Sequence, residues 1–196
     1  MKTFNTNQLI KELKTITASN IAVINKKCVH LNIDQLNWRP MHGAWNIIEV
    51  LWHLNEYAKY YHPTFESKIE NAKFRDFKEI FTPSPLGRSA WKSMKLGRAK
   101  NIKRKFKAPK PMNPTFINEL HGENELTAFI EHQEKLLTLL DKSNTVNWRK
   151  TKVPISISKL VRLRLGDALM FVIYHNERHI QQIVNILIHP NFPKKK

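Results

Sequence analysis

The chain has 196 residues, and its 33 lysines and arginines against 16 aspartates and glutamates give a net charge of +17 at pH 7. That length suits a single domain, because one core of about 100 to 200 residues already buries most of its chain's surface. Hydrophobic residues make up 41% of the chain, which excludes a disordered polycation. The lone cysteine, Cys28, excludes an intramolecular disulfide and a cysteine-rich zinc finger, as expected in a reducing compartment.

Neither a membrane span nor an export signal is predicted. The longest apolar run, about residues 168–174, is far shorter than the roughly 20 residues that cross a bilayer. The first residues are mostly polar and lack the apolar stretch and small-residue cleavage site of a signal peptide. We therefore expect a cytoplasmic protein without a membrane partner.

Four long helices are predicted from apolar residues that recur with a period of about 3.6 residues. The first is expected over residues 5 to about 31, and the second over about 46–61. The third is expected from residue 123 to about 141, and the last from about 163 or 167 to 188. Helices of this length are long enough to pack along one another in a bundle.

The second helix carries the clearest boundary signals. Asn46 can cap its start by accepting a backbone N–H bond, and Glu49 stands three positions later, where the acid of a capping box belongs. Pro63 marks the predicted far end of this helix, and Pro190 stops the last helix.

The segments between the helices predict the topology. Residues 62–122 show no long period and include Pro83, Pro85, Pro109, Pro111 and Pro114, which indicates a long crossover connection. Residues 144–159 are interpreted as an extended connector rather than a strand. A short first link favours antiparallel neighbours, whereas the long connection allows the second and third helices to run parallel. The predicted fold is all-α, an up-down-down-up four-helix bundle. It forms a single domain over residues 1–196, with a basic crossover insertion at about 62–122.

The positive charge is concentrated in these connections and in the C-terminal tail. Residues 80–118 contain ten basic residues and no acid, residues 142–166 contain seven and no acid, and the chain ends in three lysines. Such a surface suits nucleic acid, anionic lipid or an anionic small molecule, or is a solvated face without a partner. The first run holds only Trp91 and Phe106 as aromatic residues within its basic part, so a stacking platform for single strands is not favoured.

Three of the nine histidines form a candidate metal site. His175 and His179 stand at positions i and i+4 of the last helix, so their rings project from one face about one turn apart. If the second and last helices are neighbours, His53 can face the pair and complete a site of three nitrogens with a position open for water or substrate. Pairs with this spacing also occur as solvated or hydrogen-bonded side chains. The other six histidines are assigned surface or capping roles: His30, His42, His62, His121, His132 and His189.

A histidine that binds a metal usually donates its other N–H group to a carboxylate or a carbonyl. The candidate acceptors are Glu49, Glu56, Glu177 and Gln182. The sequence does not choose among them, and for Glu49 the capping role competes with this one.

Two segments resemble motifs of the DinB-like (YfiT-like) family. Residues 36–40 and 43–54, with Trp45 at the start of the helix and His53 two turns in, resemble the entry to that family's second helix. Residues 166–182, with their His-x-x-x-His pair, are similar to the family's last helix. The resemblance extends loosely over most of the chain. It implies a four-helix bundle that holds divalent nickel, zinc or iron through His53, His175 and His179, and it makes a homodimer an expectation.

The first functional hypothesis is a metal-dependent enzyme. A metal held by three neutral histidines lowers the pKa of a bound water or thiol, which makes a nucleophile available for a hydrolase or a thiol S-transferase. The resemblance implies thiol chemistry, since relatives include S-transferases and isomerases that use low-molecular-weight thiols. A cationic rim suits an anionic small-molecule substrate. Arg178, beside the histidine pair, is a candidate to bind the substrate's anionic group, and the alternative is that it is a surface residue. No catalytic residue is assigned, and no Ser/His/Asp set, phosphate loop or nucleophilic cysteine offers a rival mechanism.

The alternative is a non-catalytic binding module whose basic connector binds nucleic acid or an acidic partner. This alternative predicts a steep dependence of affinity on salt. No helix-turn-helix is evident, so nucleic acid is not favoured. A purely structural member of the family is the third possibility.

Overall fold

The computed structural model describes residues 3–99, 101–102, 106–116, 122 and 124–194, and these are mostly helical. The α-helices in this part of the chain are α1 (Thr6–Lys27), α2 (Ile33–Asn37), α3 (Ile47–Glu70), α4 (Pro85–Met94), α5 (Asn124–Lys142) and α6 (Leu165–Leu187). Short strands form two pairs, β1 (Phe4–Asn5) with β2 (Ile80–Phe81) and β3 (Lys152–Ile155) with β4 (Ser158–Arg164). The predicted all-α class is confirmed. None of the described helices combines the length and the apolar character that a membrane crossing requires.

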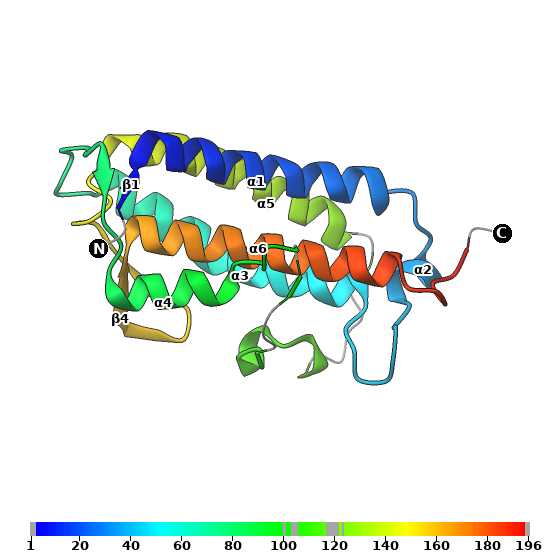
Figure 1. The fold of residues 1–196 in the computed structure, drawn as a ribbon. Helices are drawn as coiled ribbons and strands as arrows, with labels where there is room; N and C mark the ends of the chain where they lie inside the picture. Colours follow the sequence, from blue (N-terminus) through cyan, green and yellow to red (C-terminus); the bar gives the residue numbers. More distant parts are fainter. Residues whose placement is uncertain (1–2, 100, 103–105, 117–121, 123, 195–196) are drawn as a thin grey trace.

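The four long helices α1, α3, α5 and α6 lie side by side (Figure 1). α1 and α3 each pack against both α5 and α6. In Figure 1, α1 and α6 run from left to right, whereas α3 and α5 run from right to left. Their facing sides bury aliphatic and aromatic residues, among them Leu13, Leu51, Phe65, Phe129, Leu136, Leu169 and Ile183. As a result, α3 and α6, which carry the three candidate histidines, are direct neighbours.

The predicted cap of the second helix is confirmed in α3. The Asn46 side chain accepts a hydrogen bond from the Glu49 backbone N–H at 2.8 Å, and the Glu49 carboxylate accepts one from the Asn46 N–H at 2.9 Å. Arg39 also donates to both oxygens of Glu49 at 2.6 Å. The start of α3 is therefore fixed two turns before the candidate site.

The predicted end of that helix at Pro63 is wrong, because α3 continues through Pro63 to Glu70. A proline inside a helix costs about 3 kcal/mol, since it removes one hydrogen bond and crowds the preceding turn. Beyond it, however, Phe65 and Ile69 are buried in the core, and each such side chain contributes about 1.5 to 3 kcal/mol. Tertiary packing thus offsets the local cost. The first helix is also shorter than predicted, because α1 ends at Lys27, four residues before the expected end. The short helix α2 follows it, and the Asn32 side chain caps the start of α2.

The crossover connection begins after Glu70, later than predicted, and it is partly structured. Its helix α4 packs against α6, and Ser84 donates hydrogen bonds from its N–H and its hydroxyl to Asp167 Oδ2 at 2.9 and 2.8 Å. α4 comes so close to α6 that a Cβ at Gly87 would lie 2.1 Å from Asp167 Cγ. The centre of the basic run, including Lys100 and Lys103–Lys105, lies outside the described residues.

The interpretation of residues 144–159 as an extended connector is also wrong. β3 and β4 form an antiparallel hairpin in which Val153 pairs with Leu163. Both of these side chains are buried against the helical core, whereas Ile157 and Leu160 near the tip of the hairpin are exposed. The packing of this one pair on the core, and not a regular alternation, therefore fixes the strands. The hairpin leads directly into α6 at Leu165.

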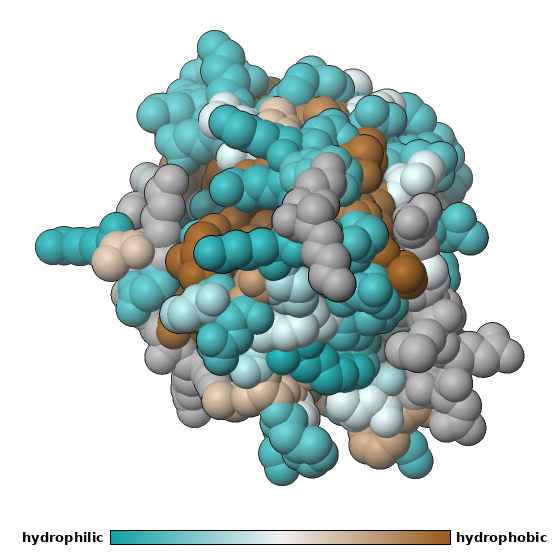
Figure 2. Space-filling model, turned by 90° about the vertical axis from the view of Figure 1, so that its right-hand side faces the viewer, coloured by the Kyte–Doolittle hydropathy of each residue, from teal (hydrophilic) through white to brown (hydrophobic). Residues whose placement is uncertain are grey.

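Figure 2 shows the end of the molecule to which α2 belongs, with apolar residues gathered between hydrophilic side chains. A shallow cleft of about 320 Å³ is lined there by residues that include Cys28, Val29, Leu36 and Leu126. Burial raises the pKa of the Cys28 thiol to about 12, so the thiol stays protonated at pH 7 and is a poor nucleophile. This agrees with the absence of a nucleophilic cysteine signature in the sequence.

Candidate metal centre

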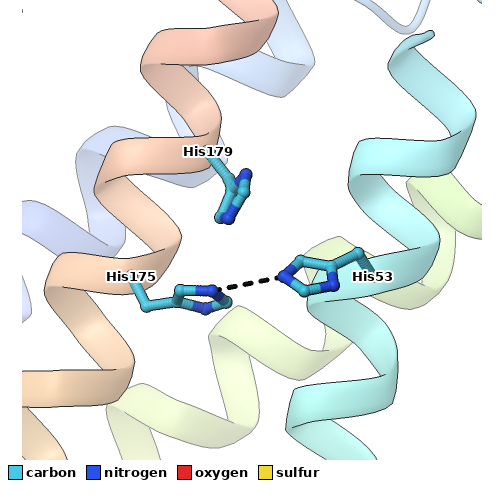
Figure 3. A group of neighbouring side chains, drawn as sticks. All are labelled: His53, His175 and His179. Carbon is cyan, nitrogen blue, oxygen red and sulfur yellow. Dashed lines mark hydrogen bonds between the residues drawn. The ribbon is translucent and has the colours of Figure 1, made fainter. Parts of the chain in front are cut away.

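The three predicted histidines come together between α3 and α6 (Figure 3). His53 lies in the second turn of α3, and His175 and His179 lie one turn apart on α6. His53 and His175 are only 2% and 4% exposed, and His179 is half-buried. Because α3 and α6 pack directly, rings that are more than 120 positions apart in the chain converge on one space.

The distances between the rings suit a shared ion. The Nε2 atoms of His53 and His175 are 3.2 Å apart, and each of the three rings offers a nitrogen within 4.8 Å of the other two. Two nitrogens that bind one zinc at about 2.0 to 2.1 Å in tetrahedral geometry lie about 3.3 Å apart. The His53–His175 separation matches that spacing.

Hydrogen bonds fix the tautomers of two of the histidines. His53 Nδ1 lies 2.5 Å from the backbone oxygen of Met112, and since a carbonyl only accepts, the proton of His53 sits on Nδ1. His179 Nδ1 likewise donates to Gln182 Oε1 at 2.9 Å. Each ring therefore keeps its Nε2 lone pair for a ligand.

His175 is held differently. Because His53 Nε2 carries no proton, the 3.2 Å contact between the two Nε2 atoms is a hydrogen bond donated by His175. Its Nδ1 is buried and has no hydrogen-bond partner in the part of the chain that the structure describes. A buried nitrogen without a hydrogen-bond partner has lost its hydration without compensation, so the tautomer of His175 is less firmly fixed than those of His53 and His179.

All three imidazoles are neutral at pH 7. Burial lowers the pKa of His53 to about 4 and that of His179 to about 3, and it holds the pKa of His175 well below its usual value. Desolvation disfavours the charged form in each case. Neutral imidazole is the form that binds a metal, so burial prepares the donors.

Aromatic rings surround the three histidines. Trp45 lies 5.0 Å from the His53 ring and stacks on His179 at 6.1 Å between centroids. Tyr57, one turn after His53 on α3, lies 4.4 Å from the His175 ring, and Phe171 stacks on His175 at 5.8 Å. These rings exclude water from the flanks and restrict how far the imidazoles can turn.

The predicted partners of the histidines have mixed outcomes. Gln182 does contact His179, as one of the alternatives foresaw. The described contacts of Glu49 are with Arg39 and Asn46, and Glu56 pairs with Lys59 at 2.6 Å, so neither of these glutamates orients His53. Glu177 stands between His175 and His179 in the sequence of α6, two positions from each, so it does not share their face of the helix.

Arg178 is buried beside the pair rather than on the surface. It is 6% exposed, and its guanidinium lies 5.6 Å from the centroid of the Phe106 ring in the connection. Burial lowers the pKa of Arg178, and its positive charge in turn contributes to the lowered pKa of His175 and His179. The structure thus places a cation next to the three nitrogens.

The sequence did not reveal the partner of His53, the Met112 carbonyl. Any residue offers a backbone carbonyl, so residue type carries no signal for it, and the connection has no periodicity from which its path follows. Sequence reasoning also misplaced His62, which is buried on α3 against His132 instead of lying at a surface or helix end.

Comparison with known proteins adds the family. The family model described as the DinB superfamily matches residues 26–183, a range that includes all three histidines. No curated protein and no solved structure matches the chain. Since the matched range covers most of the 196 residues, the chain belongs to the DinB superfamily, a metal-binding family.

Proposed function

We propose that this protein is a metal-dependent enzyme in which His53, His175 and His179 hold a divalent metal, with the four long helices forming an up-down-down-up bundle around it. The observation that carries the proposal is the convergence of three neutral imidazoles, two of them buried and one half-buried, from two helices within 4.8 Å. Membership of a metal-binding superfamily supports it.

The donor set fits a borderline metal such as zinc, nickel or iron. When bound, the metal would act as a Lewis acid that lowers the pKa of a water or a low-molecular-weight thiol, the nucleophile of a hydrolase or a thiol S-transferase. The protein's own part is positional. Met112 and Gln182 keep protons on the Nδ1 atoms of His53 and His179. For His175 Nε2 to bind a metal, the proton of that neutral ring would have to move from Nε2 to Nδ1, which has no described partner.

An anionic substrate is the class that the surroundings favour. Arg178 lies beside the histidine pair on α6, and its positive charge contributes to the lowered pKa of His175 and His179. Charge-assisted hydrogen bonds in a site shielded from water are roughly twice as strong as neutral ones. We propose that Arg178 positions a carboxylate or phosphate group of the substrate.

Elemental analysis of tag-free protein grown in metal-replete medium tests the metal. We expect one divalent metal per chain in the wild type, a loss of most of it in His53→Ala and His175→Ala, and full occupancy in His42→Ala, which alters an exposed histidine. A wild-type protein without stoichiometric metal would remove the proposal's main support.

Activity assays with the metal-loaded protein then separate the two chemistries, by transfer of a low-molecular-weight thiol to an electrophile or by hydrolysis of esters and amides. With an anionic substrate, Arg178→Met should raise KM while leaving a neutral analogue unaffected. Equal effects on both substrates would show that Arg178 does not recognise charge.

A non-catalytic binding module remains the second candidate, because Arg98, Lys107 and Lys110 of the connection are exposed and face no described acid. Affinity for DNA, RNA or an acidic peptide is measured between 50 and 300 mM salt. A steep decline with salt that is lost on neutralising Lys107 and Lys110 is the result expected for this candidate.

A further inference from the structure

A proline-rich segment of the crossover connection reaches the candidate site. Residues 109–114, Pro-Lys-Pro-Met-Asn-Pro, are here called the proline strap. The strap contacts α3, and within it the Met112 carbonyl accepts the 2.5 Å hydrogen bond from His53 Nδ1. Through this bond the strap contacts one of the three candidate histidines, here called the histidine triad.

The backbone of the strap is rigid for reasons visible in its sequence. Pro109, with φ of −56°, precedes the 3₁₀ turn Lys110–Met112, and Pro111 lies inside that turn. Backbone hydrogen bonds from Met112 to Pro109 and from Asn113 to Lys110 close it at 2.9 and 3.3 Å. Because each proline has a fixed φ, few conformations compete with the one that aims the Met112 carbonyl at His53. A second 3₁₀ turn then begins at Pro114, which is buried.

The direction of that carbonyl decides what His53 can do. A neutral imidazole carries its proton on either nitrogen, and only the form with the proton on Nδ1 leaves Nε2 free to bind. The carbonyl accepts and never donates, so it selects that form and also fixes the rotation of the ring. His179 obtains the same help from a side chain of its own helix, whereas His53 obtains it from a segment 59 residues away.

We propose that the proline strap is the positioning element for His53, and that its backbone rigidity sets the affinity of the three-histidine site for a divalent metal. The inference rests on the proposed function, since it says what sets the metal affinity of that site. Linkage makes the effect reciprocal, so a bound metal must stabilise the docked strap by as much as the docked strap stabilises the metal. The connection that carries the basic residues is then energetically coupled to the metal.

The test compares Pro109→Gly/Pro111→Gly, which loosens the strap but keeps every carbonyl, with two controls. Met112→Ala removes the side chain and leaves the carbonyl, and Pro190→Gly makes the same backbone change at an exposed position beyond α6. Affinity for Zn²⁺ is measured by competition with a chelating dye. We expect the double variant to bind Zn²⁺ about 10- to 100-fold more weakly, the loss usual for a disrupted partner of a metal ligand, and both controls to stay within a few-fold of the wild type.

A second readout needs no metal. In ¹⁵N NMR of the metal-free protein, the wild-type His53 should show a single tautomer protonated on Nδ1, and the double variant a mixture. Circular dichroism confirms that each variant is folded. In the wild type, Zn²⁺ should slow hydrogen exchange of the Asn113 amide, which closes the 3₁₀ turn of the strap.

The outcomes distinguish the two proposals. If the wild type binds Zn²⁺ and the folded double variant binds it equally well with His53 still in one tautomer, the strap does not position His53 and only the further inference fails. If the wild type binds no Zn²⁺, the proposed function fails, and the proposed effect of the strap on metal affinity fails as well.

Discussion

His62 provides a test of how burial controls charge in the helical core, away from the three candidate ligands. It is 4% exposed on α3, with its ring 5.4 Å from that of His132 on α5. Burial lowers the pKa of His62 from 6.5 to about 3, with further contributions from His132 and Lys135 against the opposing charge of Glu66. Its Nδ1 has no described hydrogen-bond partner. A proton on His62 is therefore strongly disfavoured in the folded protein.

The sign and size of the effect follow from the two pKa values. Between pH 6.5 and pH 3 the unfolded chain binds a proton at residue 62 that the folded chain does not bind, so the free energy of unfolding falls as the pH is lowered through that window. Each pKa unit corresponds to about 1.4 kcal/mol. Between pH 7 and pH 4 about 2.5 units are traversed below the unfolded pKa, and His62 alone should account for a loss of about 3 kcal/mol.

Urea unfolding at pH 7 and pH 4 in the presence of EDTA measures this loss. His62→Gln removes the titrating group, so its loss of stability between the two pH values should be about 3 kcal/mol smaller than that of the wild type. The triad histidines also titrate, but they are present in both proteins and cancel in the difference. His42→Gln, at an exposed site, should behave as the wild type does. An unchanged pH dependence in His62→Gln would refute the reasoning, whatever its stability at pH 7.

Three further predictions concern packing, capping and the metal. Gly87→Ala should destabilise the fold by about 1 to 3 kcal/mol in thermal unfolding, because its Cβ would lie 2.1 Å from Asp167 Cγ. Gly122→Ala is the control, since a Cβ there would have nothing within 4 Å, and it should leave stability unchanged. Equal effects of the two substitutions would contradict the close approach of α4 to α6. Asn46→Ala should lower the free energy of urea unfolding by about 1 kcal/mol through loss of the capping box, and restoration by Asn46→Ser would separate this from a packing effect. A chelator should lower Tm only if the protein holds metal, since ligand at about 100 times Kd contributes about 2.7 kcal/mol, and re-adding metal should reverse the shift.

The sequence predicts those parts of the fold in which local pattern and tertiary packing agree. The long helices α1, α3, α5 and α6 were expected from their apolar periodicity, and the Asn46–Glu49 cap from the spacing of two residues. Pro63 misled because the burial of later residues outweighs a local penalty that is visible in the sequence. α4 was missed because its ten residues make fewer than three helical turns, which is too short for a periodic pattern of apolar residues to stand out.

The candidate site divides along the same line. The i, i+4 spacing of His175 and His179 is a property of one helix, and the expected packing of the second helix against the last one added His53, which the resemblance to the DinB-like family supported. What orients His53 is a main-chain oxygen, and its position depends on the path of a connection without periodicity. Glu49 and Glu56 each lie one turn from His53, but Arg39 and the Asn46 N–H bind the Glu49 carboxylate, and Lys59 binds that of Glu56.

The crossover connection is anchored at two places, by Ser84 on Asp167 at the start of α6 and by Met112 on His53 in the second turn of α3. The stretch of chain between the anchors begins with α4, which packs against α6, so the connection is held to the bundle at both of its described ends. The connection thus joins two helices of the bundle independently of the residues that carry its charge, because its anchors are a serine and a backbone carbonyl.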